Sequence, residues 1–179
     1  MNVLVLYGSS RRHGNTEILT DRVVQNVDCT KIYLSDKKIH PIDDKRHDAE
    51  GFGFVDDDYD DIIQQVLNHD TLVFSTPVYW YGMSGQMKNF IDRWSQSLRD
   101  KRFNFKASMA EKTAYVVMVG GDEPRIKGLP LVQQFKHIFD FVHMSFGGYV
   151  LGQGNAPGDI LNDARALADA LLLNQSLRS

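Results

Sequence analysis

The sequence predicts an α/β protein in which helices cover both faces of an open, doubly wound parallel sheet. Strand-like and helix-like segments alternate along the chain, which is the pattern of repeated β–α units. The first strand-like segment, residues 3–7, is apolar up to a final tyrosine, as expected of a central strand. A length of 179 residues suits one hydrophobic core. We therefore expect residues 1–179 to form a single domain.

Five short apolar segments are the predicted strands, and each precedes a helical pattern. The strands are expected at residues 3–7, 31–34, 71–75, 113–119 and 149–151. Apolar residues three and four positions apart mark one face of each helix. In the first four helices these are Leu19, Val23 and Val27; Ile62, Ile63, Val66 and Leu67; Met87, Phe90, Ile91 and Trp94; and Phe135, Ile138, Phe139 and Val142. In the last helix we expect Ile160, Ala164, Leu167, Ala168 and Leu171 to share the apolar face.

Composition and charge argue against several classes of function. A net charge of −3 gives no basic face for nucleic acid. Cys29 is the only cysteine, so no internal disulfide can form and a reducing compartment is favoured. Residues 1–6 lack the features of a signal peptide, and no apolar run is long enough to cross a membrane. We expect a cytoplasmic protein without nucleic-acid or membrane partners.

Sheets of this kind bind ligands beyond the carboxyl ends of their strands, which directs attention to the loops after strands one, three and four. The first loop, G-S-S-R-R-H-G-N-T at residues 8–16, leads directly into a helix whose unpaired N–H groups favour an anion. Ser9, Asn15 and Thr16 can donate hydrogen bonds, Arg11 can pair with phosphate, and Gly14 permits a tight turn. This pattern indicates a phosphate loop, although a polar helix cap would use the same residues. The loop matches neither G-x-x-x-x-G-K-[ST] nor G-x-G-x-x-G.

The other two loops carry residues suited to a flat ring. Tyr79, Trp80 and Tyr81 stand in a row after the third strand, and flat side chains beside exposed amides suit a heteroaromatic ligand. Paired glycines after the fourth strand, Gly120 and Gly121, allow close approach of the backbone to a ligand. Packing on a neighbouring helix and an ordinary turn are the alternatives for these two loops.

Residues 77–93, P-V-Y-W-Y-G-M-S-G-Q-M-K-N-F-I-D-R, resemble the signature of the NADPH-dependent FMN reductase family, and residues 8–16 are similar to its phosphate loop. The resemblance implies a flavodoxin-like fold, strand order 2-1-3-4-5, and bound FMN. The residues it implies at the phosphate are Ser9, Arg11, Gly14, Asn15 and Thr16. Those implied at the flavin and ribityl chain are Pro77, Val78, Tyr79, Trp80, Gly82 and Met83, with Gly120, Gly121 and Asp122 at the other edge of the ring.

The chain is most similar to the branch of this family related to iron–sulfur flavoproteins, whose second loop carries a compact cysteine motif. The corresponding residues 39–52 contain no cysteine, so a thiolate-bound cluster cannot form there. His40 and His47 are interpreted as surface residues, and we nominate no metal ligand. In the long segment 35–55 apolar residues do not recur at a regular spacing, and the role of this segment stays open.

The resemblance implies an oxidoreductase that takes electrons from NADPH or NADH and passes them to a small acceptor such as a quinone, a nitro or azo compound, or free flavin. Hydride transfer is flavin chemistry, so no general acid or base is nominated. A homodimer or homotetramer is expected from the family. The alternatives are a flavodoxin-type electron carrier without enzymatic activity and an interaction protein of the same fold.

Overall fold

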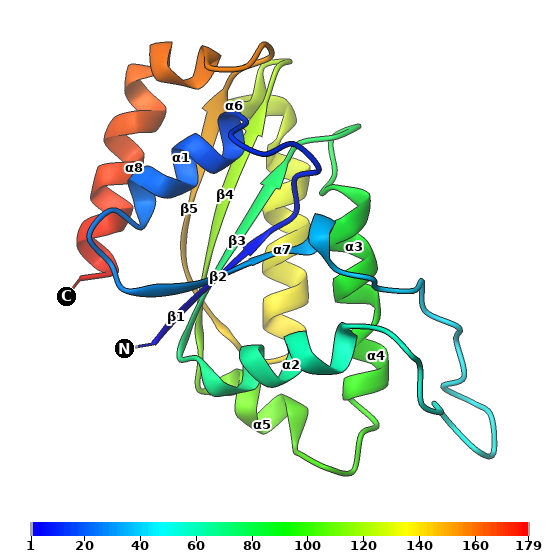
Figure 1. Cartoon of the computed structure of the whole chain (residues 1–179). Coiled ribbons are helices and arrows are strands. Elements are labelled where there is room, and N and C mark those ends of the chain that lie inside the picture. The colour runs from blue at the N-terminus through cyan, green and yellow to red at the C-terminus, as the bar shows by residue number, and fades with distance from the viewer. Residues whose placement is uncertain (1, 179) are drawn as a thin grey trace.

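The computed structural model describes residues 2–178, in which five parallel strands form one sheet of order β2-β1-β3-β4-β5 (Figure 1). The strands are β1 (Val3–Tyr7), β2 (Cys29–Tyr33), β3 (Thr71–Pro77), β4 (Thr113–Gly120) and β5 (Ser145–Gln153). The flavodoxin-like fold class and the strand order are therefore confirmed. None of the helices in this described range is long and apolar enough to cross a membrane.

Helices cover both faces of the sheet because alternate residues of the central strands point to opposite sides. Val3 and Val5 pack with α1 (Asn15–Val23) and α8 (Ala164–Ser176), whereas Leu4 and Leu6 pack on the opposite side. That side is covered by α2 (Tyr59–Asn68), α3 (Gly85–Asp92), α4 (Trp94–Ser97), α5 (Phe105–Ala110) and α7 (Leu129–Phe141) (Figure 1). The short α6 (Pro124–Lys127) and the 3₁₀ turns η1 (Leu34–Asp36) and η2 (Asp159–Asn162) complete the chain.

The strand bounds differ from the predicted ones mainly at the two edges of the sheet. β2 begins at Cys29 and ends before Leu34, which belongs to η1. β5 is much longer than residues 149–151 because it starts with Ser145 and runs through Gly147 and Gly148, a segment with little apolar patterning. Edge strands have one solvated side, so their sequences carry a weaker apolar signal than those of central strands.

The predicted buried face of the last helix is wrong. Ala166, Ala170, Leu173 and Asn174 are the buried residues of α8, whereas Leu171 is 52% exposed. Ile160 lies in η2, before the helix begins, so it does not continue the apolar stripe of α8. The buried apolar residues of α8 lie two positions after the predicted Ala164, Ala168 and Leu171.

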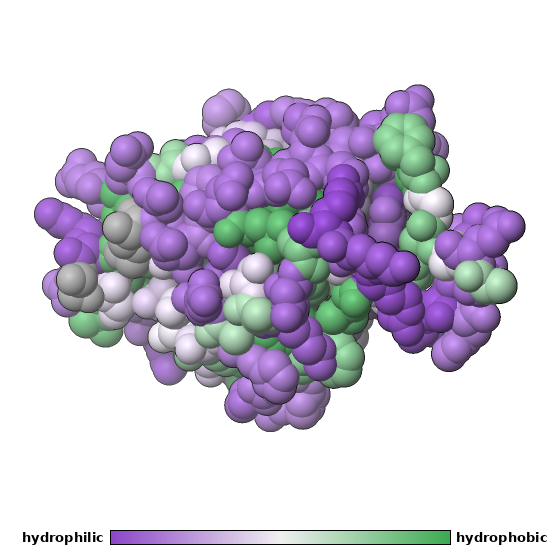
Figure 2. Space-filling model, turned by 90° about the horizontal axis from the view of Figure 1, so that it is seen from below, coloured by the Kyte–Doolittle hydropathy of each residue, from purple (hydrophilic) through white to green (hydrophobic). Residues whose placement is uncertain are grey.

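The long segment between β2 and α2 forms an arm whose two ends lie side by side. The amide of Asp58 donates to the carbonyl of Lys38 at 2.8 Å, and the amide of Lys38 donates to the Asp58 carboxylate at 2.7 Å. Between these ends, residues 41–54 project from the body (Figure 1). Seen from the amino ends of the strands, the arm stands off a mostly hydrophilic surface (Figure 2). A cavity of about 600 Å³ lies between residues 46–55 and 96–102.

A buried ion pair attaches the arm to the body. Arg93 and Asp57 have side chains only 3% and 1% exposed, and their Nη1 and Oδ2 atoms are 2.7 Å apart. Arg93 also donates to the carbonyl of His40 at 3.0 Å, and its guanidinium lies over the Tyr59 ring. Burial by itself raises the pKa of the Asp57 carboxyl, but hydrogen bonds from Arg93 and from the amides of His40 and Tyr59 outweigh it and hold that pKa below 3.8.

Candidate functional site

The first part of the site is the amino end of α1, which follows the predicted phosphate loop. The amides of Asn15, Thr16 and Glu17 have no protein acceptor within residues 2–178. Unpaired amides of a first helical turn, together with the helix dipole, form an anion site. Gly14 is the N-cap residue, and its extended backbone turns the chain into the helix.

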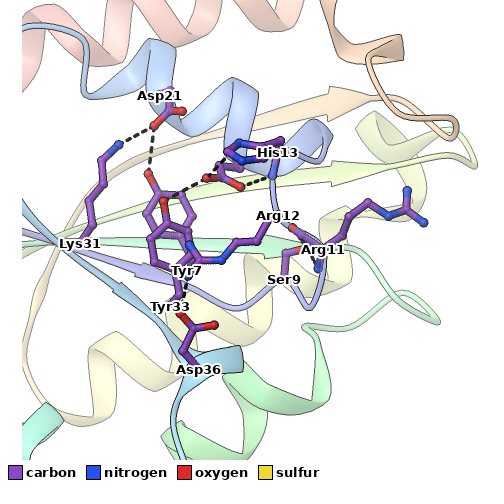
Figure 3. Close-up of polar contacts among 10 residues, drawn as sticks. Tyr7, Ser9, Arg11, Arg12, His13, Asp21, Lys31, Tyr33 and Asp36 are labelled. Carbon is purple, nitrogen blue, oxygen red and sulfur yellow. Dashed lines mark hydrogen bonds and ion pairs between the residues drawn. The ribbon is translucent and has the colours of Figure 1, made fainter.

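Two adjacent arginines in this loop have different surroundings. Arg11 is exposed, and over the described part of the chain its guanidinium has no partner, whereas Arg12 pairs with Asp36. Figure 3 shows Arg11 extending away from the residues that hold Arg12. Ser9 stabilises the turn itself, because its Oγ accepts from the amide of Arg11 at 3.1 Å. Arg11 is therefore available to an anionic ligand.

Asn15 connects this loop to the loop after β5, which the sequence reasoning did not include. Its Nδ2 donates to the carbonyl of Ala156 at 2.8 Å, and its Oδ1 accepts from the amide of Gly158 at 2.9 Å. The side chain thus braces two loops, and its backbone amide is the part left for an anion. The only sequence signal for the second loop is the glycine at position 154, where a Cβ would lie 2.8 Å from the side-chain nitrogen Nδ2 of Asn15.

The loop after β3 carries an unusual turn. Tyr79 and Gly82 exchange two backbone hydrogen bonds of 2.9 and 3.0 Å, and between them Trp80 and Tyr81 have φ values of 48° and 64°. Such two-residue turns favour asparagine and glycine, because side chains are strained in the left-handed region. Trp80 is 95% exposed on this turn. Strained backbone that presents an exposed aromatic ring is typical of a binding site.

Buried hydroxyl groups hold this turn against the sheet. Thr76 Oγ1 accepts from the amide of Ser84 at 3.0 Å, and Ser84 Oγ caps α3 by accepting from the amide of Met87. Gly8 lies against the same residues, and a Cβ there would be 2.9 Å from Ser84 Oγ. The start of the phosphate loop is thus packed against the start of α3, which follows the aromatic turn.

A cavity of about 370 Å³ lies between the aromatic turn and the loop after β4. Its lining residues are Val78, Trp80, Tyr81, Gly120, Gly121, Asp122, Pro124 and Asn155. Asp122 accepts from Tyr81 Oη at 3.1 Å and from Lys127 Nζ at 2.7 Å, so it links the two walls. The hydrogen bond from Lys127, followed by that from Tyr81, lowers the pKa of the Asp122 carboxyl.

The structure brings together only some of the predicted flavin residues in this cavity. Val78, Trp80, Gly120, Gly121 and Asp122 line it. Tyr81 also lines it, as expected from the row of aromatic residues, although the family resemblance did not include it. Pro124 and Asn155 line it as well and were not predicted. The remaining predicted flavin residues are not among its lining: Pro77 and Met83 are buried, and Tyr79 and Gly82 form the base of the turn. Thr16, which was predicted at the phosphate, has a buried side chain in α1.

These features fit a ligand that combines a flat ring with an anionic group. The unpaired amides of α1 and Arg11 suit the anion, while the cavity offers aromatic side chains and glycine backbone to a ring. No group of three or more histidine, cysteine or acidic residues is placed to hold a metal ion in the described part of the molecule.

Two proteins similar to this chain are named as flavin-containing proteins. YwqN of Bacillus subtilis (strain 168), named as an NAD(P)H-dependent FMN-containing oxidoreductase, is 57% identical over 171 residues, which are 95% of this chain and 94% of YwqN. An iron–sulfur flavoprotein of Methanocaldococcus jannaschii is 29% identical over 194 residues, covering 99% of this chain and 95% of that protein.

Solved structures extend this similarity to the fold. One described as the Trp repressor binding protein from Bacillus subtilis shares 50% identity and a TM-score of 0.81, with 96% of each chain covered. An FMN-dependent NADH-azoreductase from Bacillus anthracis, solved with FMN, has a TM-score of 0.73 and 14% identity, with 100% of each chain covered. At that identity the likeness concerns the fold alone.

A sequence model of the family described as NADPH-dependent FMN reductase matches residues 1–156. This match includes the phosphate loop, the aromatic turn and the loop after β4. The resemblance inferred from the loops, including the relation to iron–sulfur flavoproteins, is thereby confirmed. The chain belongs to the NADPH-dependent FMN reductase family.

Proposed function

We propose that this protein binds FMN at the carboxyl edge of the sheet and uses it to pass electrons from NADPH or NADH to a small acceptor. The observation that carries the proposal is that an anion site and a cavity lined by aromatic and glycine residues lie on loops of adjacent strands in a chain of this family. The phosphate would be held by the amides of α1 and by Arg11. The flavin ring would lie beside Trp80 and Gly121.

The bound flavin would supply the hydride chemistry, and the protein would supply position and access. Glycine at 120 and 121 lets a ring edge approach the backbone closely. The half-exposed Tyr81 is fixed by Asp122, so the wall of the cavity is held in place. The cavity is open to solvent, which leaves room for a nicotinamide and then an acceptor to reach the same ring in turn. The acceptors proposed are quinones, nitro or azo compounds, and free flavin.

The partners of the chain would include copies of itself. Tyr149 of β5 and Leu172 of α8 are 42% and 62% exposed and line a second cavity of about 390 Å³ at the β5 edge. Exposed apolar groups at a sheet edge favour association. We propose a homodimer or homotetramer, which light scattering of the purified protein would test. The free cysteine fits a cytoplasmic location.

Steady-state assays of FMN-loaded protein test the reductase activity. Oxidation of NADPH or NADH with each class of acceptor, following ping-pong kinetics, is the expected result. If the loaded protein oxidises neither nucleotide, the reductase proposal is wrong. Negligible nucleotide oxidation together with a stable one-electron reduced form during titration would favour the alternative of an electron carrier.

Changing Trp80 to alanine is expected to weaken FMN binding by about fivefold, because an aromatic contact contributes about 1 kcal/mol. The stability of the apoprotein should not fall, since the Trp80 side chain is 95% exposed. Flavin fluorescence titration and urea unfolding measure the two effects. Phe54→Ala is the matched control, because Phe54 is 88% exposed on the distant arm and should change neither quantity. Equal FMN affinities for the Trp80→Ala variant and the wild type would show that Trp80 does not contact FMN.

A further inference from the structure

A cluster of aromatic and charged residues lies beside the phosphate loop, on the β2 side (Figure 3). Tyr7 and Tyr33 end β1 and β2 in register, and their rings stack with centroids 4.5 Å apart and an interplanar angle of 10°. The guanidinium carbon of Arg12 lies 3.2 Å from the centroid of the Tyr33 ring. Two groups at these distances cannot share one face of a ring. Arg12 and Tyr7 therefore sandwich Tyr33, with Asp36 pairing to the guanidinium.

The hydroxyl of Tyr33 extends this cluster to the backbone of the loop. Tyr33 Oη donates to Glu17 Oε1 at 2.9 Å, and Glu17 Oε2 accepts from the amide of His13. The Glu17 side chain is only 7% exposed, so its position depends on these donors. Burial and the hydrogen bond to Glu17 both raise the pKa of Tyr33, which keeps the donating proton in place.

His13 is the residue whose conformation this carboxylate holds. Its φ of 55° lies in the left-handed region, where a residue with a side chain is strained. His13 directly precedes Gly14, the N-cap of α1, so its backbone directs the free amides of the helix end. The chain of contacts therefore runs from the Tyr33 ring through Glu17 to the shape of the anion site.

The same contacts separate the roles of the two arginines. Arg12 is held by the Tyr33 ring and Asp36, whereas Arg11 extends away from them (Figure 3). A guanidinium stacked on one ring and paired to a carboxylate has a fixed orientation. We propose that Arg12, Glu17 and Tyr33 form a clamp that shapes the phosphate loop for FMN, with Tyr33 as a positioning residue that does not touch the cofactor. This inference rests on the proposed function.

Comparison of FMN with riboflavin isolates the effect, because riboflavin lacks the phosphate. Tyr33→Phe removes the hydrogen bond to Glu17 and keeps the stacked ring. The Kd for FMN should rise by up to about tenfold, because the loop can lose at most the stabilisation that this hydrogen bond to a charged group provides. The Kd for riboflavin should change by less than about twofold, because its ring and ribityl contacts are not affected. Flavin fluorescence titration measures both constants.

Two further variants complete the experiment. Arg12→Lys keeps the charge but loses the planar stack on Tyr33, so it should weaken FMN binding selectively in the same way as Tyr33→Phe. Its side chain is 40% exposed, so folding should tolerate this change even if Tyr33→Phe does not fold. Tyr59→Phe is the control, because it also removes a tyrosine hydroxyl, which contacts Ser97 Oγ at 2.6 Å on the opposite face of the sheet.

Three outcomes would overturn the inference. Equal weakening of FMN and riboflavin in Tyr33→Phe would show a general loss of structure. Wild-type FMN affinity in Arg12→Lys would show that the positive charge, and not the stack, is what matters. If the wild-type protein itself does not bind FMN, the proposed function is refuted and the role of the clamp with it. This outcome is seen without any variant, so it can be told apart from failure of the clamp alone.

Discussion

Replacing Arg93 with methionine is expected to lower the free energy of unfolding at neutral pH by about 3–5 kcal/mol. The substitution keeps much of the side-chain volume but leaves the Asp57 carboxylate, 1% exposed, without its cation. It also removes the donor to the carbonyl of His40 and the group stacked on Tyr59. An uncompensated buried charge is among the most destabilising changes that a single substitution can cause.

The loss should depend on pH in a defined direction. In the wild type the pKa of Asp57 is lowered from 3.8, so its contribution to stability is present above that value and is lost as the pH falls through the lower folded pKa. In Arg93→Met, burial without a partner should raise the pKa of Asp57 above 3.8, so the folded variant is penalised as the pH rises. The difference between the two proteins should therefore be largest at neutral pH and shrink in acid.

Urea unfolding at pH 7 and at about pH 4 measures both effects. Arg102→Met is the matched control, because Arg102 pairs with Asp60 and Asp100 at the surface and is 56% exposed. Its loss should cost no more than about 1 kcal/mol. If both variants lose the same small amount, the pair of Arg93 and Asp57 is not a structural anchor.

Changing Arg11 to glutamine is expected to raise the Kd for FMN by about tenfold to a hundredfold, the equivalent of roughly 1.5–3 kcal/mol for a hydrogen bond to a charged group. The guanidinium of Arg11 is exposed, and within residues 2–178 it has no competing carboxylate. Its removal should therefore lower the affinity for FMN and leave the fold unchanged. Binding of riboflavin should be nearly unaffected, and the dependence of FMN affinity on salt should become weaker.

Arg165→Gln serves as the control for net charge, because Arg165 is 75% exposed on α8 and pairs only loosely with Asp169, at 3.9 Å. It should leave the FMN affinity within about twofold, since exposed charges far from a ligand are screened by salt. An unchanged ratio of FMN to riboflavin affinity in Arg11→Gln would show that Arg11 does not meet the phosphate.

The elements in the centre of the sheet were the most predictable. β1, β3 and β4 are buried on both faces, so their apolar runs carry a strong signal, and their order follows from the family resemblance. β5 and α8 were less predictable because each has one solvated side. In α8, exposed leucines such as Leu171 and Leu172 compete with the buried set, and periodicity alone cannot choose between the two faces.

The same distinction holds for the candidate site. The loops after β1, β3 and β4 could be found from glycine, aromatic and polar residues placed after apolar strands. The loop after β5 could not be found, because its place in the site depends on a hydrogen bond between Asn15 and Ala156, which are 141 residues apart in the sequence. The different surroundings of Arg11 and Arg12 depend on the ring of Tyr33, which is a tertiary contact that no local pattern encodes.

The paired ends of the arm have a consequence for how this chain could change over time. Lys38 and Asp58 are hydrogen-bonded to each other, so the packing of the core does not depend on the length of chain between them. Each doubling of a flexible insert would cost only about 0.6 kcal/mol of closure entropy. Residues 41–54 are thus an exchangeable module, in which new ligands or contacts could be acquired while the sheet and its cofactor edge stay as they are.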